Sequence, residues 1–192
     1  MIDRDGLVDA IRVAASQGDA QQAVRDVLER LVAEPASLAA ALDSGDRTCY
    51  ERLYADPTLT ILNLVLPPGL ASPIHDHGMW AVVGIYGGME SNSFYRRSGE
   101  GVEASGGREI ATGEVLMMGA STIHAVENTQ DTYLGAVHVY GGDLFSTPRS
   151  RFSVDGGEQP YDEVGIESGA RALAAIEADL GRGLRGDEVR PL

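Results

Sequence analysis

The four histidines are the residues of this chain whose type and spacing are best suited to chemistry. His75 and His77 are separated by one residue, and His124 and His138 follow further along the chain. Because alternate side chains of a β-strand project from the same face, His75 and His77 can bind one ion together. His124, arriving from a later strand, would complete a triangle of imidazoles and leave coordination positions open. The sequence therefore predicts a transition-metal site held by His75, His77 and His124.

Short strands divided by glycine turns are expected to position these histidines. From about residue 50 the chain alternates between runs of strand-forming residues and segments that contain two closely spaced glycines. The runs cover residues 58–66, 81–86, 93–96, 114–118 and 133–140. Such a pattern is typical of a β-sandwich or barrel, with the jelly roll among the candidates.

Helices are expected at the two ends of the chain. Apolar residues recur at helical spacing over residues 7–11, 24–32 and 173–180, and a short turn or helix is expected at 37–42. The expected organisation is a single domain over residues 1–192, with a helical N-terminal segment (1–45), a β-barrel core (46–145) and an irregular tail with a helix (146–192).

The composition limits the partners and the compartment. The chain has 192 residues, of which 43% are hydrophobic, and 29 acidic residues outweigh 15 basic ones to give a net charge of −14. This acidic balance argues against a nucleic-acid partner or an anionic membrane surface. No segment approaches the roughly 18 consecutive apolar residues of a membrane span, and the single cysteine, Cys49, allows no intrachain disulfide. We therefore expect a cytoplasmic protein that acts on small molecules.

The spacing around the histidines resembles the two motifs of the cupin superfamily. Five residues separate Gly69 from His75, and one separates His75 from His77, as in the first half of the first motif. Ten residues separate Gly113 from His124, and three separate His124 from Asn128, as in most of the second motif. The resemblance implies a mainly β fold, the cupin double-stranded β-helix or jelly-roll barrel, with a metal ion bound inside it.

The first of these motifs lacks its usual glutamate. Ala81 and Val82 stand four and five residues beyond His77, and Glu90, the alternative carboxylate, comes late in the pattern. Three neutral imidazoles leave the charge of a divalent ion uncompensated, so the open positions favour anionic ligands. A thiolate is such a ligand, because coordination lowers the pKa of a thiol. Since open iron(II) sites also react with dioxygen, this donor set favours sulfur oxidation.

A finer resemblance is to the cysteine dioxygenase branch of the cupins, the thiol dioxygenases. It rests on Ile-His-Asp-His at 74–77 and on His-Val-Tyr at 138–140. In that family the tyrosine hydroxyl hydrogen-bonds the bound substrate and oxygen, which implies a catalytic role for Tyr140 with His138 as its partner. Tyr-Glu-Arg at 50–52 resembles the family's Tyr-x-Arg, so Arg52 is expected to pair with a substrate carboxylate through its guanidinium fork.

Some positions depart from the family pattern or leave alternatives open. Arg96 and Arg97 are alternatives to Arg52 as the carboxylate-binding group. The family's Ser-x-His-x-Tyr relay begins here with Ala136, so a hydroxyl link is missing. Val82 stands where animal members carry a cysteine crosslinked to the tyrosine, so we expect no crosslink.

These observations predict an enzyme, an iron(II)-dependent thiol dioxygenase that oxidises a small thiol with dioxygen to its sulfinate. Cysteine and 3-mercaptopropionate are the leading substrates, and Arg52 favours cysteine, since relatives that act on 3-mercaptopropionate tend to lack that arginine. Two alternatives stay open. One is a non-oxidative cupin that binds a small anion, and the other is a cupin enzyme of another chemistry with a different divalent metal, because histidines also accept zinc, nickel or copper.

Overall fold

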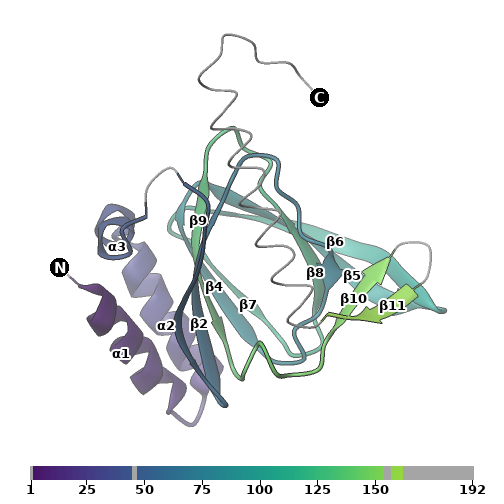
Figure 1. Cartoon of the computed structure of the whole chain (residues 1–192), viewed down its shortest axis with the longest axis horizontal. Coiled ribbons are helices and arrows are strands. Elements are labelled where there is room, and N and C mark those ends of the chain that lie inside the picture. The colour runs from purple at the N-terminus through teal and green to yellow at the C-terminus, as the bar shows by residue number, and fades with distance from the viewer. Residues whose placement is uncertain (1, 45–46, 154–156, 162–192) are drawn as a thin grey trace.

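Two antiparallel β-sheets form the body of the protein, and three helices pack on the outside of one of them (Figure 1). The computed structural model describes residues 2–44, 47–153 and 157–161. The first sheet contains, in spatial order, β1 (Cys49–Asp56), β2 (Leu59–Leu66), β9 (Leu134–Tyr140), β4 (Ala81–Gly87) and β7 (Val115–Met118). The second contains β11 (Gly157–Pro160), β10 (Ser150–Ser153), β3 (Ile74–His75), β8 (Ile123–Glu127), β5 (Met89–Ser98) and β6 (Gly101–Ala111).

Successive strands change sheets, which makes the fold a jelly roll. β3 in the second sheet leads to β4 in the first and to β5 in the second, and β7, β8 and β9 alternate in the same way. The described strand pairs are all antiparallel. The predicted mainly β jelly-roll barrel with N-terminal helices is therefore confirmed. The helix expected over 173–180 lies outside the described residues.

The central strands of the first sheet are buried on both faces. Along β2 and β4, Leu62 and Val83 belong to the apolar cluster inside the barrel, whereas Ile61 and Val82 belong to the cluster beneath the helices. A strand covered on both sides reads as a continuous apolar run and not as an alternating one. This explains why the sequence of β2 is apolar at nearly every position, and it places Val82 on the face away from the barrel interior.

The helices are α1 (Arg4–Ala15), α2 (Ala20–Val32) and α3 (Pro35–Ala41). The Asp19 side chain caps α2 by accepting a hydrogen bond from the backbone N–H of Gln22, at 3.2 Å. α2 lies very close to β4, because a Cβ atom at Gly84 would stand 2.9 Å from a methyl carbon of Val32. Within the described part of the chain, no helix has the length and apolarity needed to cross a bilayer.

Two segments differ from the sequence expectation. The glycine-containing stretch 101–111 is the long strand β6, which pairs with β5 in a hairpin, because its glycines are tolerated at an exposed sheet edge. The segment expected to be an irregular tail from residue 146 contains β10 and β11, and Arg151 of β10 pairs with His75 of β3. The second sheet therefore continues past the expected barrel boundary and supports the strand that carries the first histidine.

Candidate metal centre

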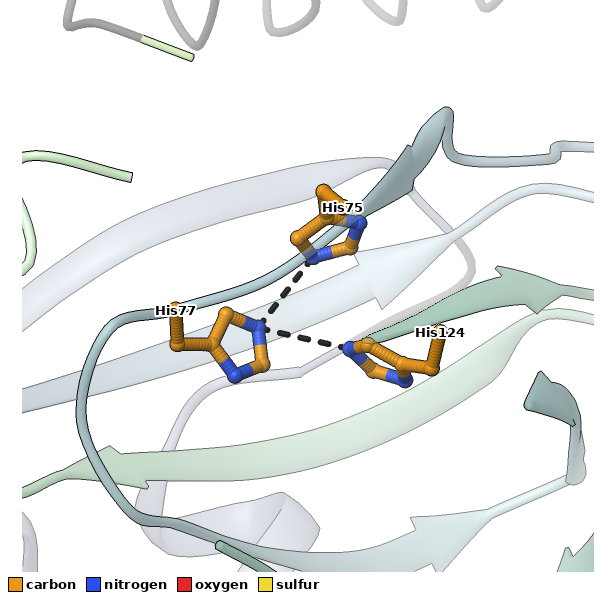
Figure 2. Close-up of side chains that lie close together, drawn as sticks. All are labelled: His75, His77 and His124. Carbon is orange, nitrogen blue, oxygen red and sulfur yellow. Dashed lines mark hydrogen bonds between the residues drawn. The ribbon is translucent and has the colours of Figure 1, made fainter. Parts of the chain in front are cut away.

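Two of the three predicted ligands come from neighbouring strands of the second sheet, and the third comes from the loop that follows the first of these strands. His75 ends the short strand β3 and lies directly opposite His124 of β8. His77 follows two residues later, in the loop that leads to β4. β10 holds β3 on its other side, so the His75 backbone is fixed between two strands. Figure 2 shows the three imidazoles pointing toward one another.

The spacing of the ring nitrogens matches the donor set of a single ion. Nε2 of His77 lies 3.1 Å from Nε2 of His75 and 3.3 Å from Nε2 of His124 (Figure 2). Two nitrogens bound to one metal at about 2.1 Å, at angles between a right angle and the tetrahedral angle, lie about 3.0–3.4 Å apart. Both printed spacings fit donors of one divalent ion, and the three ligand atoms all lie within 4.8 Å of one another.

Hydrogen bonds on the far side of the rings orient two of these nitrogens. Nδ1 of His75 donates to the carbonyl oxygen of Pro73 at 2.9 Å, and Nδ1 of His124 donates to Oδ1 of Asn92 at 2.9 Å. Both Nε2 atoms therefore carry lone pairs directed at His77. A proton on Nε2 of His77 could satisfy only one of them, whereas a cation between the rings would satisfy both.

Burial keeps the three rings neutral, as metal ligation requires. Burial lowers the pKa of His75 to about 4, and the nearby Arg149 guanidinium adds to this effect. The pKa values of His77 and His124 lie well below the usual histidine value, chiefly because of burial and then because of the neighbouring imidazoles. The lone pairs therefore stay available in neutral solution.

No carboxylate of the described chain joins the three histidines. The alternative ligand, Glu90, is fully buried, but its Oε1 accepts a hydrogen bond from Asn92 at 2.8 Å and its Oε2 faces His138. Glu90 is therefore a neighbour of the site and not a member of the metal-binding cluster. A divalent ion bound here would keep its full positive charge, as the sequence motif predicts.

His138 and Tyr140 lie on β9, with their side chains on the same face of the strand. Nδ1 of His138 is 3.2 Å from the Tyr140 hydroxyl, and the Tyr140 ring centroid is 4.9 Å from that of His77. Burial raises the pKa of Tyr140, so its hydroxyl keeps its proton. Ala136, two residues earlier on the same face, is buried and has no hydroxyl. The predicted catalytic pair therefore lies beside the metal-binding cluster.

The three arginines named from the sequence lie in exposed positions. Arg52 stacks on the ring of Phe145, with 3.8 Å from its Cζ to the ring centroid. Arg96 pairs with Glu103 at 2.8 Å, and Arg97 pairs with Glu158. The ion pairs occupy Arg96 and Arg97, whereas Arg52 contacts Phe145, one of the residues that line a cavity.

A fourth arginine, Arg149, is the residue that the sequence did not reveal. It is 9% exposed, and its Nε and Nη2 atoms have no hydrogen-bond partner among the described residues. Its Cζ lies 4.8 Å from the ring centroid of Tyr161, which in turn packs 5.3 Å from the ring of His75. The two side chains line a cavity of about 480 Å³ together with Gly78 and Phe145. Arg149 therefore places a buried positive charge beside the histidines, with no ion-pair partner in the part of the chain that the structure describes.

Comparison with known proteins finds similarity in fold. No family model matches the chain. An RmlC-like cupin family protein with a double-stranded β-helix fold from Methanocaldococcus jannaschii is 16% identical, with a TM-score of 0.45 over 53% of this chain and 85% of that one. A cupin superfamily protein from Desulfitobacterium hafniense is 15% identical, with a TM-score of 0.44 over 55% of this chain and 88% of that one. An oxalate oxidase is 17% identical, with a TM-score of 0.38 over 44% of this chain and 42% of that one. At these values the likeness says nothing about the reaction.

Proposed function

We propose that the protein is an iron(II)-dependent thiol dioxygenase that converts a small thiol acid to its sulfinate. The observation that carries this proposal is the pairing of two features in one place. Among the described residues, three buried, neutral histidines form a cluster that could hold a metal without a carboxylate, and the Arg149 guanidinium, whose Nε and Nη2 have no hydrogen-bond partner there, lies beside them. A molecule with a thiolate at one end and a carboxylate at the other satisfies both.

Electrostatics favour such a doubly anionic ligand. A divalent ion on three imidazoles keeps both of its charges, and Arg149 adds a third positive charge in a buried setting. A buried charge without a partner is unfavourable, and a bidentate carboxylate is the ligand that best fits a guanidinium. We infer that Arg149, and not the exposed Arg52, binds the substrate carboxylate. The preference for cysteine that rested on Arg52 then loses its basis, and cysteine and 3-mercaptopropionate both stay candidates.

The reaction balances without a further reagent. When bound, iron(II) supplies a centre that favours the thiolate form of a thiol and activates dioxygen. The S–H bond and the O–O bond break, and two S–O bonds form. Sulfur gives up four electrons, dioxygen accepts them, and one proton is released as the sulfinic acid ionises. The protein therefore has to orient the thiol and dioxygen and to supply hydrogen bonds.

Tyr140 is the residue placed to supply such a hydrogen bond. Its hydroxyl stays protonated, its ring packs against His77, and His138 lies at hydrogen-bonding distance from its oxygen. A donor at this position stabilises negative charge that develops on the reacting oxygen or sulfur atoms.

Replacing Tyr140 with phenylalanine is expected to lower kcat by about ten- to a hundredfold, which corresponds to one hydrogen bond to a charged group. The metal content should stay at the wild-type value, because Tyr140 donates no ligand. Steady-state oxygen uptake together with metal analysis of the same preparation measures both quantities. An unchanged kcat would remove Tyr140 from the mechanism.

The proposed function is tested by offering the iron(II)-loaded protein thiols and following oxygen consumption together with sulfinate formation. Uptake that depends on a thiol and yields an equal amount of sulfinate supports the proposal. Binding of a thiol acid or another small carboxylate without oxygen uptake would instead favour a non-oxidative, anion-binding cupin.

A further inference from the structure

A buried row of polar side chains connects the metal-binding cluster to Tyr140 from behind. It starts at His124, whose Nδ1 donates to Oδ1 of Asn92 at 2.9 Å, and it continues as Nδ2 of Asn92 donates to Oε1 of Glu90 at 2.8 Å. The other carboxyl oxygen of Glu90 faces Nε2 of His138 at 3.7 Å. Nδ1 of His138 then lies 3.2 Å from the Tyr140 hydroxyl. Strands β8 and β5 of the second sheet and β9 of the first thus contribute to one row of buried polar side chains.

The step between Glu90 and His138 is the open link in this row. Oε2 of Glu90 and Nε2 of His138 both lack a hydrogen-bond partner among the described residues, and the Glu90 residue is 0% exposed. An approach of about 0.7 Å would bring the two atoms within hydrogen-bonding distance. One proton between them would satisfy both atoms. Ala136, two residues before His138 on the same strand face, offers no hydroxyl in its place.

The position of that proton decides what Tyr140 can do. When Glu90 carries it, the carboxyl O–H donates to Nε2 of His138, so the ring proton lies on Nδ1 and donates to the Tyr140 oxygen. The Tyr140 hydroxyl proton is then free to point toward the metal-binding cluster. When Glu90 is ionised, His138 carries its proton on Nε2, and Nδ1 accepts from the Tyr140 hydroxyl instead. The same tyrosine then offers only an acceptor to the cluster.

We propose that Glu90 is a positioning residue that sets, through the tautomer of His138, whether Tyr140 donates its hydroxyl proton toward the metal centre. The tautomer itself is independent of the reaction, whereas the effect on turnover rests on the proposed function. When Glu90 is protonated, the Tyr140 hydroxyl can donate its proton toward the metal centre. When Glu90 is ionised, the Tyr140 hydroxyl donates to His138 instead.

The surroundings of Glu90 allow its side chain to be either protonated or ionised near neutral pH. Burial raises the pKa of Glu90 to about 7, against the opposing effect of the Asn92 hydrogen bond, and burial lowers the pKa of His138 to about 3. His138 therefore stays neutral while Glu90 changes state near neutral pH. Among the described residues, the titratable side chains that interact with Glu90 are His138 and Tyr140 on β9. From β6 the paired residue is the apolar Ile110.

The experiment reads the tautomer directly by NMR. ¹⁵N-histidine-labelled protein is loaded with diamagnetic zinc(II), which a three-histidine site accepts, and spectra are recorded on both sides of pH 7. The chain has four histidines, and the His138 signals are assigned by their loss in His138→Asn. The proposal expects the His138 proton on Nδ1 at the acidic end and on Nε2 at the alkaline end. A single tautomer across the range in the wild type would overturn it.

The variant Glu90→Gln tests whether the Glu90 carboxyl group controls the tautomer of His138. The glutamine amide donates to Nε2 of His138 at every pH, so His138 should keep its proton on Nδ1 throughout. The control is Glu109→Gln, which removes an exposed carboxylate from the neighbouring strand β6 and should switch as the wild type does. A Glu90→Gln protein that switches like the wild type would contradict the proposal, and the wild-type titration decides the question even if this variant does not fold.

Activity gives the second, separate readout. In iron(II)-loaded wild type, kcat/KM should fall above about pH 7 by the same factor as in Tyr140→Phe, whereas Glu90→Gln should lack this fall. Absence of thiol oxidation in every variant, with the tautomer switch present, would reject the proposed function and leave the role of Glu90 intact. Thiol oxidation with a constant His138 tautomer would reject the role of Glu90 alone.

Discussion

Replacing His124 with alanine is expected to abolish tight metal binding and all metal-dependent activity. The substitution removes one of three Nε2 donors and leaves His75 and His77 as a pair from one short segment. Loss of a direct ligand should weaken the apparent metal affinity by more than the 10- to 100-fold that loss of an outer hydrogen-bond partner typically costs. Competition with a chelator of known affinity, monitored by metal analysis, measures the change.

Two graded controls accompany this variant. Asn92→Ala removes the acceptor that orients Nδ1 of His124 and should cost about 10- to 100-fold in metal affinity. His138→Asn removes a histidine that is outside the cluster and should bind metal as tightly as the wild type does. Full metal retention and activity in His124→Ala would refute the assignment of the centre.

Replacing Arg149 with glutamine is expected to lower kcat/KM for 3-mercaptopropionate or cysteine by about a hundredfold or more. The estimate corresponds to about 3 kcal/mol for removal of one partner from a desolvated charge pair. Cysteamine, which has a thiol but no carboxylate, should be turned over at an unchanged rate. Comparing the three thiols separates loss of carboxylate recognition from general damage.

The matched control is Arg52→Gln, which removes the exposed arginine that stacks on Phe145. It should change kcat/KM by less than about threefold, as expected for a screened surface charge. Thermal melts add a second control, because Arg149→Gln removes an unpaired buried charge and should not destabilise the protein. If Arg52→Gln carried the loss and Arg149→Gln did not, the carboxylate would bind where the family motif predicts.

The cluster of three histidines could be predicted from the sequence because each of its parts stands in a short motif of fixed spacing. His75 and His77 are two residues apart, and the glycines before them and before His124 mark the turns that bring the strands together. The apolar run of β2 likewise follows from burial on both faces. Spacing and residue type are enough to find these features, although the meeting of His75 with His124 itself depends on the pairing of β3 with β8.

Arg149 and Glu90 could not be assigned in this way, because their positions depend on pairing between distant strands. Arg149 immediately precedes β10, which lies beside the metal cluster only because it pairs with β3 some 75 residues earlier in the chain. Glu90 belongs to the site because β5 pairs with β8, which brings Asn92 within reach of His124. A sequence motif does not show how β10 pairs with β3 or how β5 pairs with β8.

The most direct test of the proposed function is an isotope measurement on the product. The iron(II)-loaded protein is supplied with ¹⁸O₂ and either 3-mercaptopropionate or cysteine in ordinary water, and the sulfinate is analysed by mass spectrometry. We expect one sulfinate for each dioxygen consumed, with both of its oxygen atoms carrying the label. No thiol-dependent oxygen uptake at full iron loading, or a product with one labelled atom and one atom from water, would contradict it.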